Sequence, residues 1–323
     1  MTAADLVLRP ATPEDAAFAA DMYTELQPDD PEDPVLWQHW WANVDPTATV
    51  QRYVALLEGK PAGLAGMVHA SWDKMPERYA RVMGEAARDV RTAERVDALL
   101  AFSEDLARRD GALRATSWAW EWDAPRVGWL TARGYKEERR ERFWELDLAA
   151  NRAKLQEMTR LSRERMKQQG IKVQTVADDP DPEKDRKIWL MSEEASQDTP
   201  RTVPWVPTPF EVVEKWFSSP GISEDRMWIA RVGDHIVGIS ALSYPPVRGV
   251  VSTDWTGTAR SVRGKGVARA IKCETVMQAI ALGVDRVRTD NDYKNKPILH
   301  INDSMGYQPR PEMIQFIKEL AAS

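Results

Sequence analysis

The sequence matches itself at one fixed offset, the separation between Arg91 and Arg263. The residues that recur at this offset include glycines and prolines, which constrain backbone geometry wherever they occur. The matched pairs are Arg91 and Arg263, Gly111 and Gly283, Arg114 and Arg286, Pro125 and Pro297, Gly134 and Gly306, and Tyr135 and Tyr307. The period is far longer than that of a solenoid repeat. The pattern therefore predicts a tandem duplication of one whole domain.

Segments upstream of these pairs follow the same plan. Residues 53–63 and 228–238 each predict two strands joined by a polar turn. Residues 6–15 and 171–178 each predict a first strand followed by the start of a helix. Both halves thus begin with the same succession of elements, and the duplication extends over the whole chain.

The boundary between the halves is predicted from the segment after the last strand of the first half. Residues 148–169 are rich in Ala, Lys, Arg and Glu, which favour a helix, and a glycine follows them. We therefore expect an N-terminal domain of residues 1–147, a connecting helix of residues 148–170 and a C-terminal domain of residues 171–323. A chain of 323 residues is long enough for two domains with separate cores.

Charge and composition argue against several classes of function. The net charge of −6 and the pI near 5.5 disfavour a nucleic-acid or membrane-surface binder, because those partners select basic surfaces. One cysteine, Cys273, and four scattered histidines predict neither a disulfide framework nor a metal centre. No basic and apolar leader opens the sequence, and no apolar run is long enough to cross a bilayer. We therefore expect a cytoplasmic protein.

Residues 258–268 predict a pyrophosphate-binding turn. The segment has the pattern of a strand end, a turn with Gly264 and Gly266, and the first turn of a helix. Glycines let the backbone approach a phosphate closely, and a helix N-terminus offers free N–H groups and a positive dipole. Arg263 and Lys265 add positive charge. The alternative is a phosphate loop of another α/β fold, although a Walker loop would need Gly-Lys followed by Ser or Thr.

A family resemblance rests on this segment. The run 263–268, Arg-Gly-Lys-Gly-Val-Ala, resembles the (Arg/Gln)-x-x-Gly-x-(Gly/Ala) signature of the GNAT acyltransferase superfamily, and residues 287–292, Asn295 and the Gly306-Tyr307 pair follow at the usual distances. The resemblance covers residues 227–307 and, through the duplication, extends to the whole chain. It implies an α+β, mixed α/β fold of two tandem GNAT-like domains, in a layout similar to that of mycothiol synthase. Each domain has a mixed, largely antiparallel central sheet that is flanked by helices and splayed between its fourth and fifth strands.

The resemblance also implies where an acyl-CoA binds. In this superfamily the donor enters where the fourth and fifth strands separate, and a backbone N–H, here near Thr258, binds the thioester oxygen. Many members protonate the leaving thiolate with a tyrosine at the position of Asn302, whereas an asparagine can only hydrogen-bond the sulfur. With acetyl-CoA as the expected donor, the implied binding residues are Thr256, Thr258, Ala259, Arg263, Gly264, Lys265, Gly266, Val267, Ala268, Asn295 and Asn302.

The attacking amine must lose a proton, so a carboxylate is expected near the ends of these strands. Asp254 is the first candidate, because strict alternation along its strand places it on one face with Thr256 and Thr258. Asp290 and Asp292 are the alternatives. Structural roles compete with this hypothesis: a bond from Asp254 to a neighbouring turn, or a cap on the following helix by the other two.

The N-terminal half lacks the features that suit a phosphate. Glu94 places bulk and negative charge where a pyrophosphate would lie, and we interpret residues 1–147 as a degenerate copy. Trp118, Trp120 and Trp122 share one face of a strand there, which predicts packing under a helix or across the domain interface, with an apolar pocket as the alternative. The residues that replace Gly264, Lys265, Gly266, Asn295 and Asn302 are Thr92, Ala93, Glu94, Asp123 and Leu130.

Substrate selection is expected from residues 199–210, a stiff segment rich in proline and aromatic residues. Glu193, Glu194 and Asp198 precede it, and such an acidic rim suits a cationic amine; the alternative is a solvated helix end. We therefore expect an acyl-CoA-dependent N-acyltransferase that acts on a small-molecule amine, with its site in the C-terminal half. A non-catalytic CoA-binding protein is the alternative.

Overall fold

The computed structural model describes residues 2–3 and 5–320. The first half of the chain begins with an antiparallel meander and ends with one long strand. Its strands are β1 (Thr2–Ala3), β2 (Leu6–Pro10), β3 (Ala48–Leu57), β4 (Lys60–Ala70), β5 (Tyr79–Ala86), β6 (Arg114–Trp120) and β7 (Lys136–Asp147). Its helices are α1 (Ala16–Leu26), α2 (Pro34–Ala42), α3 (Ala93–Arg109) and α4 (Ala124–Ala132).

Helix α5 (Arg152–Gln168) lies in the segment that we expected to connect the halves. The second half then repeats the plan of the first. Its strands are β8 (Lys172–Thr175), β9 (Met227–Val232), β10 (His235–Ser243), β11 (Ser252–Thr258), β12 (Arg286–Asp292), β13 (Gln308–Pro309) and β14 (Met313–Glu319). Its helices are α6 (Lys184–Gln197), α7 (Phe210–Phe217), α8 (Val267–Ala281) and α9 (Lys296–Met305).

The duplicated residues mark the same structural positions in both halves. Strands β6 and β12 begin and end at the offset that relates Arg91 to Arg263, and helices α4 and α9 begin at the same offset. Pro125 and Pro297 each occupy the first turn of these helices, where a proline has no N–H to lose. Gly134 and Gly306 follow the same helices in the left-handed region, with φ of 89° and 102°. The repeated glycines and prolines are therefore helix start and stop signals.

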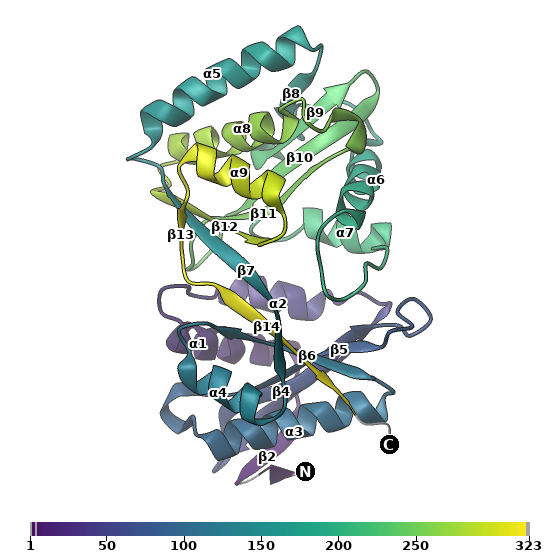
Figure 1. Cartoon of the computed structure of the whole chain (residues 1–323), viewed down its shortest axis with the longest axis vertical. Helices are drawn as coiled ribbons and strands as arrows, with labels where there is room; N and C mark the ends of the chain where they lie inside the picture. Colours follow the sequence, from purple (N-terminus) through teal and green to yellow (C-terminus); the bar gives the residue numbers. More distant parts are fainter. Residues whose placement is uncertain (1, 4, 321–323) are drawn as a thin grey trace.

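One continuous sheet joins the two halves. The strand order is β1-β2-β3-β4-β5-β6-β14-β7-β12-β11-β10-β9-β8, with β13 paired to β7. Strand β14, from the end of the chain, lies between β6 and β7 of the first half, while β7 pairs with β12 of the second half. Figure 1 shows these two strands crossing between the lobes. The last strand of each half therefore pairs with a strand of the other half: β7 pairs with β12, and β14 pairs with β6. Strand β14 thus crosses the boundary that we propose between residues 147 and 171.

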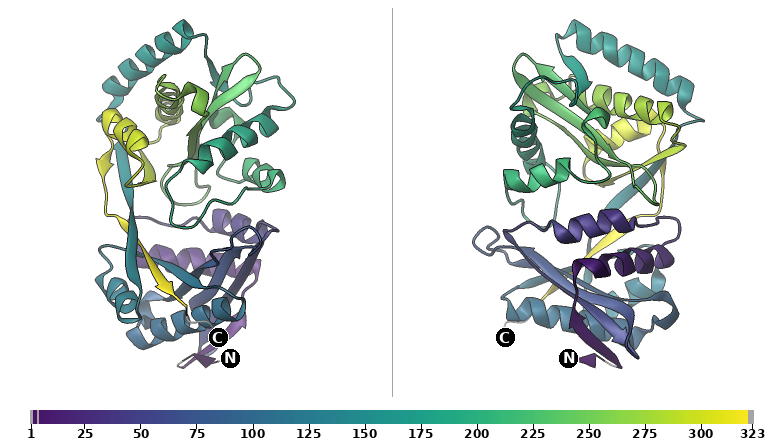
Figure 2. Two further views of the ribbon diagram at one scale, coloured as in Figure 1. Left: turned by 45° about the vertical axis from the view of Figure 1, so that its right-hand side comes forward. Right: turned by 180° about the vertical axis from the view of Figure 1, so that it is seen from behind.

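The hydrophobic cores of the two lobes show the same exchange of strands. Ile314 and Phe316 of β14 are buried in the core of the N-terminal lobe, whereas Leu146 of β7 is buried with Cys273 in the core of the C-terminal lobe. Figure 2 shows α5 outside α8, and α1 and α2 on the side of the N-terminal lobe that faces the other lobe. Asp33, which caps α2, also accepts the backbone N–H of Val247 from the C-terminal lobe at 2.6 Å. The lobes are thus joined by side chains as well as by strands.

Among the described residues, no helix is both long enough and apolar enough to span a membrane.

Candidate active site

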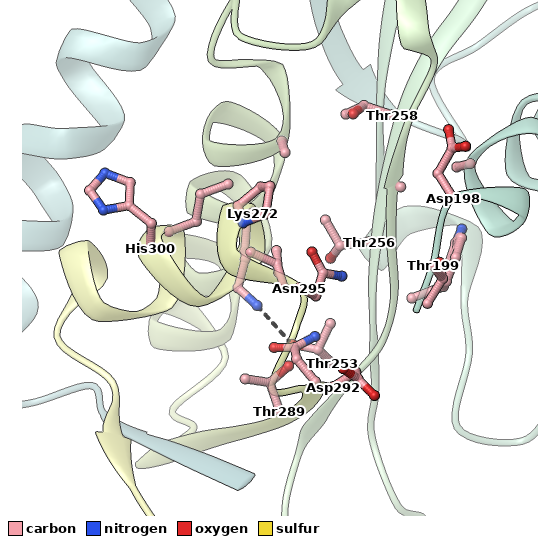
Figure 3. A pocket seen from close by; sticks show the side chains of 18 of the residues that line it. Asp198, Thr199, Thr253, Thr256, Thr258, Lys272, Thr289, Asp292, Asn295 and His300 are labelled. Carbon is pink, nitrogen blue, oxygen red and sulfur yellow. Dashed lines mark hydrogen bonds between the residues drawn. The ribbon is translucent and has the colours of Figure 1, made fainter. Parts of the chain in front are cut away.

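A cavity of about 1250 Å³ lies where β11 and β12 separate. The two strands are parallel, and in the described residues their only paired position is Ser252 with Arg288. The walls come from α5, β11, the turn and first half of α8, the end of β12, α9, the segment 198–204 and β7. Figure 3 shows Thr256 on the side of β11 towards α8, and Asp198 on the other side. The cavity therefore reaches both faces of the sheet.

The turn before α8 has the backbone that its glycines predict. Gly264 and Gly266 have φ of 75° and 89°, in the left-handed region that favours glycine. Gly266 is the N-cap of α8, and no side chain caps the helix, so its first N–H groups have no side-chain acceptor. Arg165 of α5 lies over this turn: its guanidinium donates to the carbonyl of Gly264 at 3.3 Å, and a Cβ at Gly266 would lie 3.3 Å from it. Our sequence analysis missed Arg165, because the connecting helix carries no motif.

Asp198, at the end of α6, binds two arginines of the same turn. Its carboxylate lies 2.7 Å from Nε of Arg260 and 2.6 Å from Nη1 of Arg263. These guanidinium groups hold the pKa of Asp198 well below its usual range. Glu194 accepts the backbone N–H of Arg260 at 2.6 Å. Two of the three residues expected to form an acidic acceptor rim therefore bind the turn before α8 instead.

A β-bulge in β11 determines where Asp254 lies. Trp255 pairs with Ala241 and Thr253 with Leu242, so Asp254 is an extra residue that has no partner on β10. Nε1 of Trp216, in α7, donates to the Asp254 carboxylate at 2.5 Å, whereas Thr253 accepts from Lys272 of α8. Thr253, and not Asp254, thus shares the face of Thr256 and Thr258; that part of the sequence prediction is wrong because the bulge breaks the alternation. Asp254 still lines the cavity, where desolvation raises its pKa.

The edge of β11 next to the cavity is open. The N–H of Ala259 donates to the carbonyl of Val237 at 3.0 Å, which makes this pair a hydrogen-bonded pair of the antiparallel ladder. Such pairs alternate, so Thr258 and Thr256 are in non-hydrogen-bonded pairs and their backbone N–H and C=O groups point away from β10. Strand β12 has already diverged at this level. An extended ligand can therefore pair with β11 as an additional strand.

The carboxylates at the end of β12 differ in their surroundings. Asp292 is buried and binds Arg139 of β7 at 2.6 Å. Asp290 is exposed to the open cavity but enclosed by protein on its other sides, and this desolvation raises its pKa to about 7, with Glu141 of β7 adding to the effect. No side-chain hydrogen bond to Asp290 is present in the described part of the chain. Of these two carboxylates, Asp292 is therefore paired with a cation, whereas Asp290 has no such ion pair among the described residues.

Comparison with solved structures identifies the architecture. A tandem GNAT protein from the clavulanic acid biosynthesis pathway matches 98% of this chain over 99% of its own, with a TM-score of 0.74 and 15% identity. The chain has the tandem GNAT fold. A GCN5-related N-acetyltransferase from Sphaerobacter thermophilus matches 99% of this chain over 97% of its own, with a TM-score of 0.67 and 17% identity. The prediction of two mixed, largely antiparallel GNAT-like units is confirmed.

A third similar structure has a described acceptor. It is the glucosamine N-acetyltransferase region of a fungal multi-domain GH3 β-N-acetylglucosaminidase, which matches 98% of this chain over 38% of its own, with a TM-score of 0.65 and 13% identity. At these identities the likeness shows the fold alone. The sequence matches no protein-family model and no curated protein.

Most, but not all, of the residues that the resemblance implies for CoA binding line the cavity. Those that line it are Thr256, Thr258, Arg263, Gly264, Gly266, Val267, Ala268 and Asn295. Ala259 and Lys265 lie beside it. Asn302 is fully buried, donates to Asn291 at 2.7 Å and does not line the cavity, so this position does not support direct contact with a thioester sulfur. Tyr307 is a core residue.

Lys272 is a cavity residue that the sequence analysis missed. It lies on α8, is fully buried, and reaches Oγ1 of Thr253 with a long hydrogen bond of 3.4 Å (Figure 3). Desolvation lowers its pKa to about 8. A signal was present in the sequence, because Lys272 lies directly between Ile271 and Cys273, two residues of the core type.

In the N-terminal GNAT unit, an ion-pair network fills the corresponding splay between β5 and β6. Arg126 binds the carbonyls of Gly84 on β5 and Trp118 on β6, at 2.9 and 2.7 Å, and the buried Glu85 at 2.7 Å. Arg91, the counterpart of Arg263, binds Glu85 too. The space that a CoA arm would need is therefore occupied by side chains.

Two more features distinguish the N-terminal unit from the C-terminal unit, in which we expect the CoA site. The side chain of Thr92 caps α3, so its first N–H groups are less available than those of α8. The tryptophans of β6 pack on β7: Trp118 lies under the guanidinium of Arg139, and Trp120 contacts Phe143. Trp122 follows β6 and is half exposed. These contacts favour the packing interpretation over an apolar pocket.

Proposed function

We propose that this protein is an acyl-CoA-dependent N-acyltransferase that uses acetyl-CoA and a small-molecule amine, with its active site in the cavity between β11 and β12. The observation that carries the proposal is that one cavity joins an open strand edge at Thr256 and Thr258 to the glycine turn before α8. The amide groups of a pantetheine arm can hydrogen-bond to the open strand edge, and a pyrophosphate can bind at the glycine turn. The acetyltransferases with the same fold support the proposal.

The donor is bound by charge at one end of the cavity and by backbone groups at the other. Arg263 and Arg165 supply guanidinium groups at the turn, where they complement the uncapped N-terminus of α8. The backbone N–H of Thr258, directed away from β10, is the proposed donor to the thioester oxygen. Negative charge grows on that oxygen when the amine nitrogen attacks the carbonyl carbon, so this hydrogen bond strengthens in the transition state.

A carboxylate takes the proton that the amine loses. Asp254 remains the first proposed base, because it lines the cavity and desolvation raises its pKa. Asp290 meets the same conditions and is the alternative, while the Asp292 carboxylate is bound by Arg139 and is the last candidate of the three. The carbon–sulfur bond then breaks. No tyrosine or cysteine side chain of the described residues lines the cavity, so the proposed proton source for the thiolate is water.

The acceptor side of the cavity is built by both halves of the chain. Segment 198–204 forms one wall, and β7 contributes Arg139 and Glu141. Glu193 holds the segment in place by accepting the backbone N–H of Thr208 at 3.1 Å. We propose that the amine enters here, opposite the glycine turn that holds the phosphates.

Calorimetry with acetyl-CoA tests the donor site. We expect one molecule bound per chain, and at least a tenfold loss of affinity in Gly266→Glu, because the new carboxylate opposes the pyrophosphate. Gly128→Glu is the matched control: it introduces the same side chain in α4, where a Cβ meets no heavy atom within 4 Å. Since φ at Gly266 strains any side chain, Arg263→Glu provides a second variant without that strain. Unchanged affinity in both would refute the placement.

A thiol-release assay tests catalysis. The protein is mixed with acetyl-CoA and a panel of diamines, amino sugars and amino acids, and free CoA thiol is followed with time. Release that depends on one class of amine supports the N-acyltransferase. Tight binding of acetyl-CoA without release for any amine would favour the non-catalytic CoA-binding alternative. A second tight site per chain would show that the N-terminal unit is not degenerate.

A further inference from the structure

The Asp254 carboxylate is bound by an indole on one of its two oxygens. Nε1 of Trp216, in α7, donates to Oδ2 of Asp254 at 2.5 Å. In residues 2–3 and 5–320 this carboxylate has no other hydrogen bond and no ion pair. Asp254 is exposed and lines the cavity, whereas Trp216 is not among the residues that line it. One oxygen is therefore held by α7, and Oδ1 can accept a proton from a ligand in the cavity.

The kind of donor decides how basic the carboxylate stays. Asp198, at the same cavity, is bound by two guanidinium groups, and their positive charges hold its pKa well below its usual range. An indole N–H is a neutral donor that cannot accept a proton. It orients a carboxylate without placing a full positive charge beside it. The pKa of Asp254 responds to burial, which raises it, and to the Trp216 N–H, which lowers it, and to no charged side chain of the described residues.

Helix α7, which carries the indole, contacts both lobes. Trp216 and Phe217 pack on the core of the C-terminal lobe, with their ring centres 5.1 Å apart. From the N-terminal lobe, Nε2 of His39 in α2 lies 3.3 Å from the backbone carbonyl oxygen of Lys215, which accepts from it when Nε2 carries the proton. An indole that is packed in this way has little freedom, so the fold sets the direction of its N–H.

We propose that Trp216 is a positioning residue for Asp254: its indole N–H holds Oδ2, so that Oδ1 accepts the proton of the attacking amine. This inference rests on the proposed N-acyltransferase function with Asp254 as its base. As the bond between the amine nitrogen and the thioester carbon forms, a nitrogen–hydrogen bond of the amine breaks and its proton moves to Oδ1. Trp216 keeps its own proton throughout and still donates to Oδ2 of the neutral acid.

Two replacements of Trp216 remove the donor and keep an aromatic ring. They are Trp216→Phe and benzothienylalanine at the same position, which keeps the shape of tryptophan with sulfur in place of the N–H. We expect normal binding of acetyl-CoA and a fall in kcat of about ten- to hundredfold, because the carboxylate is no longer held in one orientation. The acid limb of the kcat/KM pH profile should move up by about one pH unit, because the anion loses a hydrogen bond.

Trp228→Phe is the matched control for these replacements. Trp228 packs on the same core as Trp216, and its indole N–H donates to Gln278 at 2.8 Å. It does not line the cavity and has no contact with Asp254 among the hydrogen bonds of the described residues. We expect normal turnover and an unmoved acid limb in this variant.

An NMR readout that needs no turnover separates this inference from the proposed function. The indole N–H signal of Trp216, identified by its loss in Trp216→Phe, is followed with pH in the free protein. We expect it to titrate with Asp254 in the wild type and to lose that titration in Asp254→Asn. A Trp216 signal that titrates equally in both proteins, or in neither, overturns the inference.

The activities of the same variants distinguish the remaining outcomes. Wild-type kcat and an unmoved acid limb in Trp216→Phe would overturn the inference and leave the N-acyltransferase function intact. Full turnover in Asp254→Asn would overturn it as well, because another group is then the base. A titrating Trp216 signal in a protein that acetylates no amine would refute the proposed function, and with it the catalytic role of the pair, but not the hydrogen bond itself.

Discussion

The carboxylate of Asp198 lies 2.6 Å from Nη1 of Arg263, so the end of α6 is tied directly to the turn before α8. The same carboxylate binds Arg260. Segment 198–204 begins at this contact and forms the other wall of the cavity. The donor side and the acceptor side of the proposed active site therefore share one ion pair. A phosphate bound at the turn would compete with Asp198 for Arg263.

Asp198→Asn should consequently bind acetyl-CoA more tightly. The amide keeps the shape of the carboxylate but removes a negative charge beside the phosphates and frees Arg263. We expect a gain of about two- to fivefold at low salt, which shrinks as salt screens the charges. Calorimetry at two ionic strengths measures it. Asp234→Asn is the control, because Asp234 is an exposed carboxylate that binds Lys187. Equal affinity of Asp198→Asn and wild type would show that Arg263 does not bind phosphate.

The three candidate bases can be ranked by isosteric substitution. If Asp254 accepts the proton, Asp254→Asn should bind acetyl-CoA normally and lose about two to four orders of magnitude in turnover. Asp290→Asn and Asp292→Asn measured in the same assay give the ranking. A structural Asp254 would instead show a lower melting temperature with normal turnover per folded molecule. Full rates in all three variants would mean that the acceptor amine arrives already neutral.

The raised pKa of Asp290 also leads to a prediction about the stability of the protein. Its pKa is about 7 in the folded protein and near 3.8 when exposed, so the folded state binds more protons between these values. Stability must then fall as pH rises from about 4 to 7, and the loss is complete above pH 7. Asp290→Asn removes this loss. Its melting temperature should exceed that of wild type at pH 8 and match it at pH 4. A pH-independent difference would contradict the raised pKa.

The strand exchange predicts a large effect from a residue near the C-terminus. Phe316 of β14 is 3% exposed and belongs to the core of the N-terminal lobe. Phe316→Ala should lower the free energy of unfolding by about 3–5 kcal/mol. Gln308→Ala, at an exposed position of β13, should cost little. Denaturant unfolding followed by tryptophan fluorescence measures both. A change confined to the C-terminal lobe would contradict the exchanged sheet.

The sequence by itself determined the repeated elements and the backbone of the donor turn. Pro297 and Gly306 start and stop a helix because their backbone preferences are local, and the same preferences act at their counterparts in the first half, Pro125 and Gly134. Gly266 likewise adopts the left-handed conformation that its position before α8 requires. Features of this kind depend on a few neighbouring residues, so a single sequence is enough to predict them.

Only the tertiary structure decided which side chains meet. The bulge at Asp254 arises from pairing with β10, and period-two alternation cannot foresee an inserted residue. The insertion of β14 between β6 and β7 depends on which strand edge is left open after both halves form. The repeat in the sequence predicts only two separate sheets. Arg165 reaches the cavity from α5, whose sequence carries no motif, and Lys272 reaches it from α8, several residues beyond the glycine motif. Long-range packing selects these contacts, because the burial of charge and apolar surface is settled by the whole fold.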